Sequence, residues 1–387
     1  MIKVSLFSQM LAHFPREKFD VLVKKYQSDK HSKGIKSWTH LVSMLFCQIA
    51  GASSVRDISH GLRSITGNMY HLGISRVPCK SSLSYINQHR AYEVFKDYYF
   101  VLLDHLMSRH SFARNSLKRL KRKIYLMDAS IIPLCLEMFD WANYRSTKGA
   151  VKLHTVLDYD GLLPVFALLT DGKTAEINVA RQVGFTKGSV IVVDRGYLDV
   201  KWLSNLDSSG CFYVTREKSN MVFDVLDSYQ VEGNVLLDED IILTGATSKK
   251  DYPKKLRRIK FLDSISGKEY VFLTNNFTWK DQTVADIYKE RWHIEVFFRQ
   301  IKQNLKIKSF VGTSENAVQI QIWTALMAIL LLKFLKDKAQ YDWNLSNLIT
   351  FVRLNLFVKI NLDKWLNFPF YQSASSTENS QLSFFDG

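Results

Sequence analysis

Apolar residues recur with two different periods along this chain of 387 residues, and the period changes near residue 118. Before that point they return every three or four positions, for example in 38–49, which predicts amphipathic helices. Beyond it, 124–134, 151–158 and 163–170 are apolar runs of strand length, and Asp160-Gly161 between the last two is typical of a hairpin turn. The pattern therefore predicts helices first and a sheet afterwards.

Beyond residue 170 the pattern alternates between helices and strands. Residues 174–183 and 199–208 have helical periodicity, whereas 189–194 and 211–215 are short apolar runs, as in strands buried on both faces. An antiparallel hairpin pair followed by such units predicts an α/β fold with a mixed sheet and helices on both sides. From 217 to 280 short strands follow one another without helical periodicity, which predicts an all-β insertion.

Helical periodicity returns at residue 282, and the last residues, 371–387, are rich in Ser, Gln and Asn, so we expect a frayed tail. The apolar run 322–332 is too short to span a bilayer, which favours a buried core helix. The changes of pattern predict five regions, namely a helical N-terminal domain (1–117), the first part of an α/β core (118–216), a β-rich insertion (217–280), the second part of the core (281–335), and a C-terminal helical region with the frayed tail (336–387).

The charge balance favours a nucleic-acid partner. The formal net charge is +15 and the isoelectric point is near 9.4, so a polyanion is expected, nucleic acid before a membrane surface. One basic cluster would usually be a solvated face, but five in one chain favour a binding surface. The clusters lie at 24–25, 30–36, 118–123, 249–260 and 302–308.

The four cysteines are far apart and show no paired spacing, which argues against a zinc site and a disulfide framework. The N-terminus has no apolar run of the kind found in a signal peptide. We therefore expect reduced thiols and a cytoplasmic, nucleoid-associated protein of bacterial type.

The N-terminal part contains a helix pair that resembles a helix-turn-helix, although a plain helical bundle remains the alternative. Ser54 can cap a helix that starts at Val55, and Ser82 can cap a second helix that reaches Arg90. If the second helix is a recognition helix, its candidate DNA contacts are Lys80, Ser82, Tyr85, Asn87, Gln88 and Arg90.

One stretch, 285–305, places reactive side chains along a single stripe. At about 100° per residue, Tyr288, Arg291, Glu295 and Lys302 fall within a sector of about 60°, with apolar residues beside it. A carboxylate among cations suits a site that handles a metal ion and phosphates. The alternative is an amphipathic helix with a solvated charged edge.

Two aspartates in apolar strands favour the metal and phosphate site over the solvated edge. Asp128 lies in the middle of one predicted strand and Asp194 ends another. Such a charge is costly to bury unless it is paired or bound to a metal, although a strand-end cap or a salt bridge would also explain either one alone. Together with Glu295, three carboxylates from separate elements predict a site for two Mg²⁺ ions, with Mn²⁺ as a substitute.

The order of these elements resembles a ribonuclease H-like fold, and the motifs resemble a family. Asp128, Asp194 in Asp-Arg-Gly-Tyr, and Glu295 within Tyr288-x2-Arg291-x3-Glu295-x6-Lys302 are similar to the DDE transposases of bacterial insertion sequences. Within these, the chain resembles the IS-four family with its Tyr-Arg-Glu-Lys signature. The segments 148–154 and 310–312 and the long β insertion are also similar, and the resemblance covers about 120–335.

The resemblance implies a role for each site residue. Asp128, Asp194 and Glu295 would bind the two metal ions. The residues implied as phosphate contacts at the transposon end are Tyr288, Arg291 and Lys302. Further candidate DNA contacts are Lys152, Arg195, Trp292, Lys80 and Arg90. A flipped base would stack on Trp292, Trp279 or Phe277, whereas His154 is expected to be a core histidine and Tyr197 a core residue.

The resemblance also implies a reaction and partners. A homodimer would pair the terminal inverted repeats of its element, cleave the ends by metal-dependent hydrolysis and transesterification, and join them to target DNA in a cut-and-paste reaction. Two alternatives remain, a catalytically silent sequence-specific DNA-binding protein and a ribonuclease H-like nuclease without strand transfer.

Overall fold

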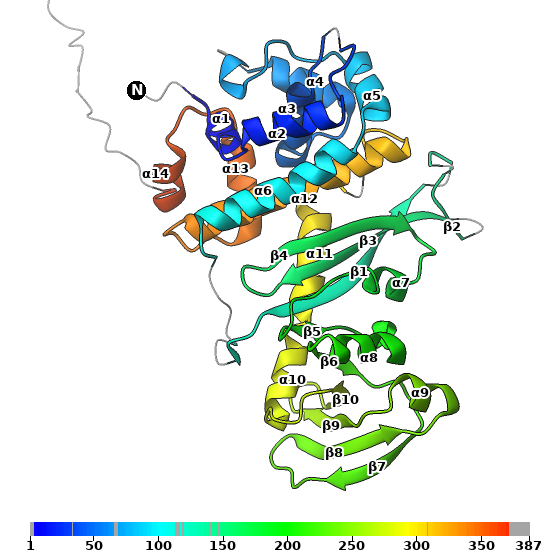
Figure 1. The fold of residues 1–387 in the computed structure, drawn as a ribbon. Helices are drawn as coiled ribbons and strands as arrows, with labels where there is room; N and C mark the ends of the chain where they lie inside the picture. Colours follow the sequence, from blue (N-terminus) through cyan, green and yellow to red (C-terminus); the bar gives the residue numbers. More distant parts are fainter. Residues whose placement is uncertain are drawn as a thin grey trace, which may run out of the picture.

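A helical layer, a central sheet and a β-rich extension follow one another along the molecule (Figure 1). The computed structural model describes residues 4–32, 34–65, 69–112, 117, 120–135, 137–139, 141–145, 148–307 and 309–370. The predicted tail (371–387) and parts of three predicted basic clusters (33, 118–119 and 308) therefore lie outside the described residues. The predicted α/β class with a mixed sheet is confirmed at this level.

The helical layer combines the two ends of the chain. Its N-terminal helices are α1 (Leu6–Leu11), α2 (Arg16–Lys25), α3 (Ser37–Ala50), α4 (Val55–Arg63), α5 (Lys80–His89) and α6 (Glu93–Arg109), with a 3₁₀ turn at Met69–Leu72. They pack with α12 (Glu315–Lys338), α13 (Leu345–Leu354) and α14 (Leu362–Asn367). Ser54 accepts a hydrogen bond from the backbone of Asp57, as its position before α4 predicted. The predicted cap at Ser82 was wrong, because α5 already begins at Lys80.

The long apolar helix α12 is the centre of this layer. It contacts α3, α5, α6 and α13. Its 24 residues would be long and apolar enough to cross a membrane, but 94% of its most apolar window is buried inside the fold. It is therefore the core helix that the sequence predicted. The predicted boundary at residue 335 was wrong, since it falls inside this helix.

One ten-stranded sheet forms the rest of the frame, in the order β2-β3-β1-β5-β6-β10-β9-β8-β7, with β4 also paired to β3. The first strand, β1, is antiparallel to β3 and parallel to β5, which in turn is parallel to β6. The strand bounds are β1 (Ile124–Leu134), β2 (Asn143–Arg145), β3 (Lys148–Asp158), β4 (Leu163–Asp171), β5 (Val190–Val192) and β6 (Phe212–Arg216).

The insertion extends this sheet, because β10 pairs with β6. Its strands are β7 (Phe223–Ser228), β8 (Val235–Leu243), β9 (Leu256–Asp263) and β10 (Lys268–Thr274). The prediction of an all-β insertion was wrong in one respect, since a short helix, α9 (Ala246–Asp251), joins β8 to β9.

Ion pairs hold the acidic residues in the middle of β8. Asp238 forms an ion pair with Arg257 at 2.6 Å, and Asp240 pairs with Lys255 at 2.6 Å. Paired carboxylates can be buried in a strand, so the polar interruption at 238–240 does not end it.

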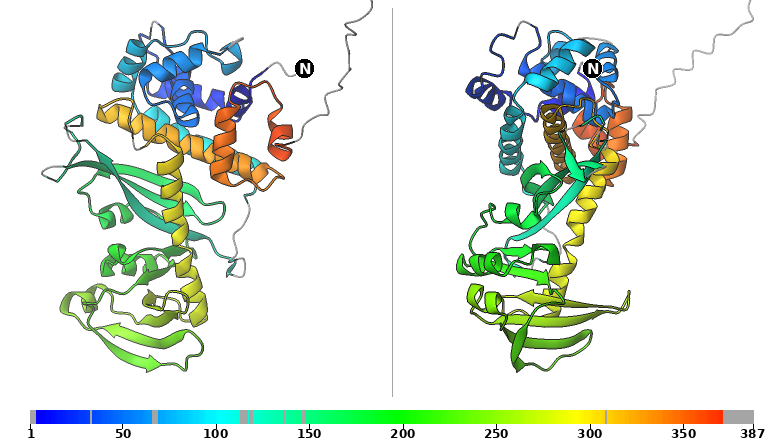
Figure 2. Two further views of the ribbon diagram at one scale, coloured as in Figure 1. Left: turned by 180° about the vertical axis from the view of Figure 1, so that it is seen from behind. Right: turned by 90° about the vertical axis from the view of Figure 1, so that its right-hand side faces the viewer.

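The two faces of β1 face two different cores. Leu126 and Ile132 belong to the large core that α11 (Trp292–Asn304) and α12 share, whereas Tyr125 and Met127 belong to a smaller core under α8 (Val200–Ser208). Figure 2 shows α11 along one face and α8 with α7 (Glu176–Ala180) on the other. This alternation decides which polar residues of β1 can meet α11.

The prediction of one continuous helix through 285–305 was wrong. The structure has α10 (Asp281–Lys289) and α11, separated by a turn at Glu290 and Arg291. Across this turn the backbone hydrogen bonds run to the third preceding residue, as from Arg291 N–H to Tyr288 O (3.0 Å) and from Ile294 N–H to Arg291 O (3.1 Å). Such bonds wind the chain more tightly than an α-helix, and therefore rotate α11 relative to α10.

The buried lysine of α12 generates a stability prediction. Lys333 donates to Leu162 O at 2.7 Å and lies 5.3 Å from the ring centre of Phe297, and burial lowers its pKa to about 7. Between pH 7 and the ordinary lysine range the unfolded chain binds the additional proton, so this group makes stability rise with pH there, by about 1.4 kcal/mol per pH unit at most. We expect Lys333→Met to stabilise the fold more at pH 6 than at pH 9 in urea unfolding.

The exposed Lys359 provides the control, since Lys359→Met should change stability equally at both pH values. An equal effect of Lys333→Met at pH 6 and pH 9 would contradict the prediction.

Candidate active site

Asp128 lies where β1 continues beyond its parallel neighbour. The pairing of β1 with β5 ends at Leu126 and Val192, two residues before Asp128. The side chain of Asp128 is 20% exposed, and its Oδ1 accepts a hydrogen bond from Ala129 N–H at 2.8 Å. The end of β5 therefore leaves this edge of β1 open beside a carboxylate.

Asp194 follows β5 by two residues and turns the chain at the same edge. Its Oδ1 accepts a hydrogen bond from Gly196 N–H at 3.2 Å, so it caps the 3₁₀ turn Arg195–Tyr197. Because β1 and β5 are parallel, their carboxyl ends lie at one edge of the sheet, and both aspartates reach one cavity.

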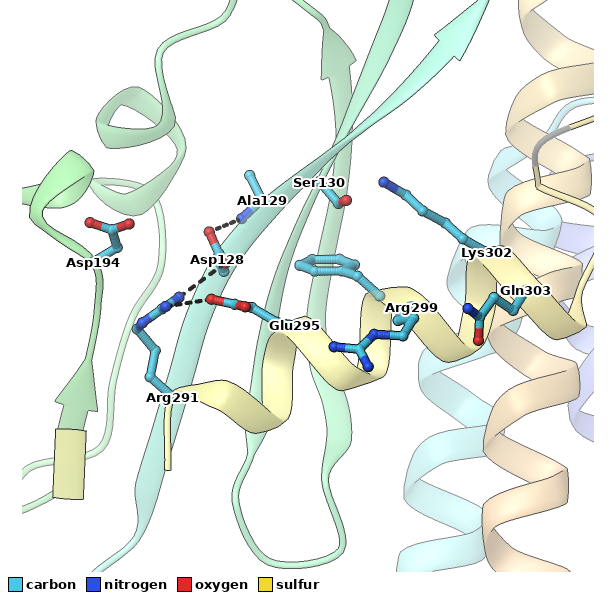
Figure 3. Close-up of a pocket in the computed structure, with 10 residues that line it drawn as sticks. Asp128, Ala129, Ser130, Asp194, Arg291, Glu295, Arg299, Lys302 and Gln303 are labelled. Atoms are coloured by element: carbon cyan, nitrogen blue, oxygen red, sulfur yellow. Dashed lines mark hydrogen bonds and ion pairs between the residues drawn. The ribbon is translucent and has the colours of Figure 1, made fainter. Parts of the chain in front are cut away.

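Glu295 reaches that cavity from α11, which lies along β1 (Figure 3). The cavity has a volume of about 470 Å³. It brings together the three predicted carboxylates and several cations, and its lining residues are Asp128, Ala129, Ser130, Asp194, Arg291, Glu295, Phe298, Arg299, Lys302 and Gln303.

The guanidinium of Arg291 lies between two of the carboxylates. One of its nitrogens is 3.4 Å from Asp128 Oδ2, and another donates to Glu295 Oε1. Burial raises the pKa of Asp128 to about 6, while the Ala129 N–H and the charge of Arg291 act in the opposite direction. Burial therefore outweighs the effect of these two contacts on the pKa of Asp128.

This donor set fits a hard divalent cation in its chemistry. Three carboxylates line one cavity, and a cation already bridges Asp128 and Glu295. Oxygen-only donors of this kind suit Mg²⁺ or Mn²⁺. With Arg291 in this position, the described residues contain no group of three Asp, Glu, His or Cys side chains arranged to hold a metal ion.

The predicted stripe of four side chains is divided between two cavities because the helix is broken. Lys302 lines the first cavity, and its Nζ donates to Ile131 O at 2.8 Å. Tyr288 instead packs on Phe272, with ring centres 4.8 Å apart, and lines a second cavity of about 500 Å³ between the insertion and α10. Arg291 and Glu295 line both cavities.

The second cavity is rich in aromatic side chains and carries two cations besides Arg291. Its aromatic and basic members are Arg216, Phe261, Tyr270, Phe272, Tyr288, Lys289, Arg291 and Trp292. Trp292 is 53% exposed, and the Arg299 guanidinium lies 5.2 Å from its ring centre. The other stacking candidates lie elsewhere, since Trp279 packs on Phe212 and neither Trp279 nor Phe277 lines this cavity.

One prediction on β3, the phosphate contact at Lys152, disagrees with the structure. Asp128 pairs with Thr155 across the antiparallel ladder, so Lys152 and His154 project from the opposite face of the sheet. Lys152 is buried, donates to Thr174 O at 2.9 Å and lies 3.6 Å from Glu176. Lys152 is therefore a structural residue in this conformation, and not an exposed phosphate contact.

His154 is buried as expected, and its Nε2 forms a hydrogen bond with the Thr170 hydroxyl at 2.9 Å. Tyr197 is likewise buried in the smaller core. Arg195, beside Asp194, is exposed and keeps its side chain accessible at the open edge.

Part of the predicted recognition surface on α5 is also inaccessible. Arg90 is only 8% exposed, and its guanidinium donates to Ile35 O at 2.7 Å and lies 3.4 Å from Asp29. Asn87 is buried as well, and its side chain bonds His40 at 2.6 Å. The predictions for these two residues were wrong because both hold α5 to its neighbours, whereas Lys80, Tyr85 and Gln88 are exposed and Ser82 is half-buried.

Sequence reasoning missed Arg299, which lines the first cavity. On the helical wheel that places Tyr288 at zero, Arg299 falls near 20°, about 40° beyond Glu295. The spacing of the sequence therefore places Arg299 beside Glu295 on the same stripe. Arg216 gave no such signal, because its place in the second cavity depends on the pairing of β6 with β10.

Comparison with known proteins identifies the family. The transposase DDE domain family matches residues 119–331, and a domain of unknown function (DUF4372) matches residues 3–75. The putative transposase y4zB of Sinorhizobium fredii (strain NBRC 101917 / NGR234) is 29% identical over 261 residues, which cover 66% of this chain and 71% of that protein.

A second relative and one solved structure are also similar. The probable transposase for insertion sequence element IS5377 of Geobacillus stearothermophilus is 29% identical over 248 residues, which cover 63% of this chain and 65% of that protein. The cryo-EM structure of a piggyBac transposase synaptic complex with hairpin DNA aligns with 90% of this chain and 79% of its own, with a TM-score of 0.41 and 8% identity. Since the family match spans more than half of the chain and includes all three carboxylates, the chain belongs to the transposase DDE domain family.

Proposed function

We propose that this transposase cuts the terminal inverted repeats of an insertion sequence and joins the freed ends to target DNA. The observation that carries the proposal is the first cavity, where Asp128, Asp194 and Glu295 from three separate elements meet Arg291 and Lys302. Carboxylates for a metal and cations for phosphates are what an in-line phosphoryl transfer needs. The Tyr-Arg-Glu-Lys spacing supports an IS-four type of element.

The strand order supports a ribonuclease H-like core within the mixed sheet. The strands β4, β3, β1, β5 and β6 are neighbours in that order, with β3 antiparallel to β1 and with β5 and β6 parallel to it. Such a core would place the three carboxylates at the open edge of β1. The insertion then extends the same sheet on the side of β6.

Asp128, Asp194 and Glu295 would hold the divalent ions, two Mg²⁺ per site or Mn²⁺ in their place. Bound there, the ions would supply an activated water or 3′-hydroxyl and stabilise the leaving oxygen. For the carboxylates to take this role, the guanidinium of Arg291 must leave its position between Asp128 and Glu295. Its planar fork could then bind a phosphate through two hydrogen bonds.

The remaining cations would position the DNA backbone around the cut. Lys302 and Arg299 line the cavity on the side of α11, and the exposed Arg195 stands beside Asp194. Lysine acts on phosphate as a point charge, whereas arginine also fixes its orientation. We assign Lys302, Arg299 and Arg195 to the phosphates that flank the scissile one.

The second cavity suits a base that has left the DNA stack. It adjoins the first cavity through Arg291 and Glu295 and carries Trp292, Tyr270 and Tyr288. An aromatic face stacks on any base. Among the predicted stacking residues we assign this role to Trp292, because it alone of the three lines this cavity.

Binding of the repeat ends would use exposed polar residues of α5, including Lys80 and Tyr85. Pairing of two ends requires two active sites, so we propose a homodimer in the synaptic complex. A cytoplasmic protein that associates with the nucleoid is consistent with these partners. If the chain only binds DNA it will not cleave the ends, and if it is a nuclease it will cleave them without joining a precut end to a target.

Loss of one carboxylate tests the proposed site. We expect Glu295→Gln to lower Mg²⁺-dependent cleavage of the element's ends by at least about 100-fold, because the change removes the charge of one proposed ligand. DNA binding should survive, since Glu295 contributes no positive charge. Gel-based cleavage and mobility-shift assays measure both effects.

A matched change on α6, Glu93→Gln, should leave cleavage at the wild-type rate. Normal cleavage by Glu295→Gln would show that the assignment of the three carboxylates is wrong.

The aromatic cavity generates a separate prediction. Removing the Trp292 ring should cost about 1–3 kcal/mol of stacking on one base, so Trp292→Ala should slow cleavage more than it weakens DNA binding. Trp292→Phe should retain part of the rate. Fluorescence of a 2-aminopurine placed near the cut reports the stacking directly, because an unstacked 2-aminopurine is bright.

Trp279→Phe is the comparison variant, and it should leave the fluorescence response unchanged because Trp279 lies outside the cavity. An equal response of Trp292→Ala and wild type would exclude Trp292 as the stacking residue.

A further inference from the structure

The turn between α10 and α11 determines where Arg291 and Glu295 point. In a continuous helix both residues would follow Tyr288 along one stripe, but the tighter turn directs Tyr288 to the second cavity and Lys302 to the first. Arg291 is the last residue before α11, and Glu295 lies in its first turn. A small rotation at this turn would therefore move both side chains relative to Asp128.

One side chain of this turn, Glu290, is held from two sides. Its Oε2 accepts a hydrogen bond from the Tyr159 hydroxyl at 2.6 Å and lies 3.0 Å from His293 Nε2. The Glu290 side chain is 17% exposed, and Tyr159 is 3% exposed. The His293 contact lies within the helical segment, whereas the Tyr159 contact comes from the end of β3, so of these two contacts only that with Tyr159 ties Glu290 to the sheet.

Tyr159 is itself tied to the strand that carries Asp128. It follows β3 directly, and its backbone N–H donates to Ile124 O, the first residue of β1, at 2.9 Å. A chain of two hydrogen bonds thus runs from the start of β1 through Tyr159 to Glu290. The residue after Glu290 is Arg291, which contacts Asp128. The hydrogen bonds through Tyr159 and the ion pair of Arg291 thus connect β1 at two points with the turn that precedes α11.

We propose that Tyr159 and Glu290 are positioning residues that hold α11 so that Glu295 and Asp128 face the same ions and phosphate. Neither residue lines the first cavity, so their effect on the reaction is exerted through the turn. This inference rests on the proposed function, because it takes Glu295 as a metal ligand and cleavage as the readout.

Three single variants test the hydrogen bond itself. Tyr159→Phe removes the donor, Glu290→Ala removes the acceptor, and Glu290→Gln keeps an acceptor oxygen at the same place. The control is Tyr229→Phe in the insertion, which removes a hydroxyl that also donates to a carboxylate, Asp240, at 3.1 Å. The probe is duplex DNA that carries the two genomic flanks of the coding sequence, cleaved over a series of Mg²⁺ concentrations.

We expect Tyr159→Phe and Glu290→Ala to lower the cleavage rate by about 10- to 100-fold, the loss that a displacement near 1 Å causes in an active site. The Mg²⁺ concentration for half-maximal cleavage should rise, while DNA affinity and melting temperature stay close to those of Tyr229→Phe. Glu290→Gln should keep most of the wild-type rate. The double variant of Tyr159→Phe and Glu290→Ala should be no slower than the slower single variant, because both changes break the same bond.

The outcomes separate this inference from the proposed function. If Glu295→Gln is inactive but Tyr159→Phe has the rate and Mg²⁺ dependence of Tyr229→Phe, the positioning role is wrong and the active site stands. Additive losses in the double variant would also overturn it. If Tyr159→Phe does not fold, Glu290→Ala against Glu290→Gln decides alone. If wild type and Glu295→Gln behave alike on this DNA, the proposed function itself fails.

Discussion

The proposed active site depends on a difference in strand length. β1 continues for eight residues after Leu126, where its pairing with β5 ends. Were β5 as long as β1, its backbone would cover the edge beside Asp128 and Asp194 would end up farther along the sheet. Because β5 is short, that edge of β1 stays open, and the chain turns at Asp194 at the level of Asp128. The long β1, supported on its other side by β3, gives the opening a rigid wall.

Charge compensation explains the rest of the arrangement. Asp128 lies in a strand whose neighbours are buried, and burial raises its pKa, so the folded chain favours a cation beside it. In this conformation Arg291 supplies that cation and bridges Asp128 to Glu295. In the proposed reaction, metal ions would take the place of the guanidinium between Asp128 and Glu295, so loading of the site would be linked to movement of Arg291.

The sequence predicted those features that depend on local pattern or on buried charge. Asp128 and Asp194 were recognisable because a carboxylate within an apolar run needs a partner, and the bounds of β1 follow its apolar run. The turn at Glu290 was not predictable, because both sides of it have helical periodicity and the anchor, Tyr159, lies far away in sequence. For the same reason Lys152 and Arg90 looked accessible. The register of β3 turns Lys152 to the other face of the sheet, and tertiary contacts at the end of α5 bury Arg90. Neither effect can be recognised from the local spacing of residues.

In the proposed function the insertion is part of the site and not a spacer between Asp194 and Glu295. Because β10 pairs with β6, the insertion continues the catalytic sheet, and α10 packs on β6, β8, β9 and β10. The aromatic wall of the second cavity comes from β9 and β10, whereas Tyr288 and Trp292 come from the helices. The ion pairs of Asp238 with Arg257 and of Asp240 with Lys255 join β8 to the segment that leads into β9 and to β9 itself. The insertion thus provides the surface on which α10 packs. The turn after α10 then sets the direction of Glu295.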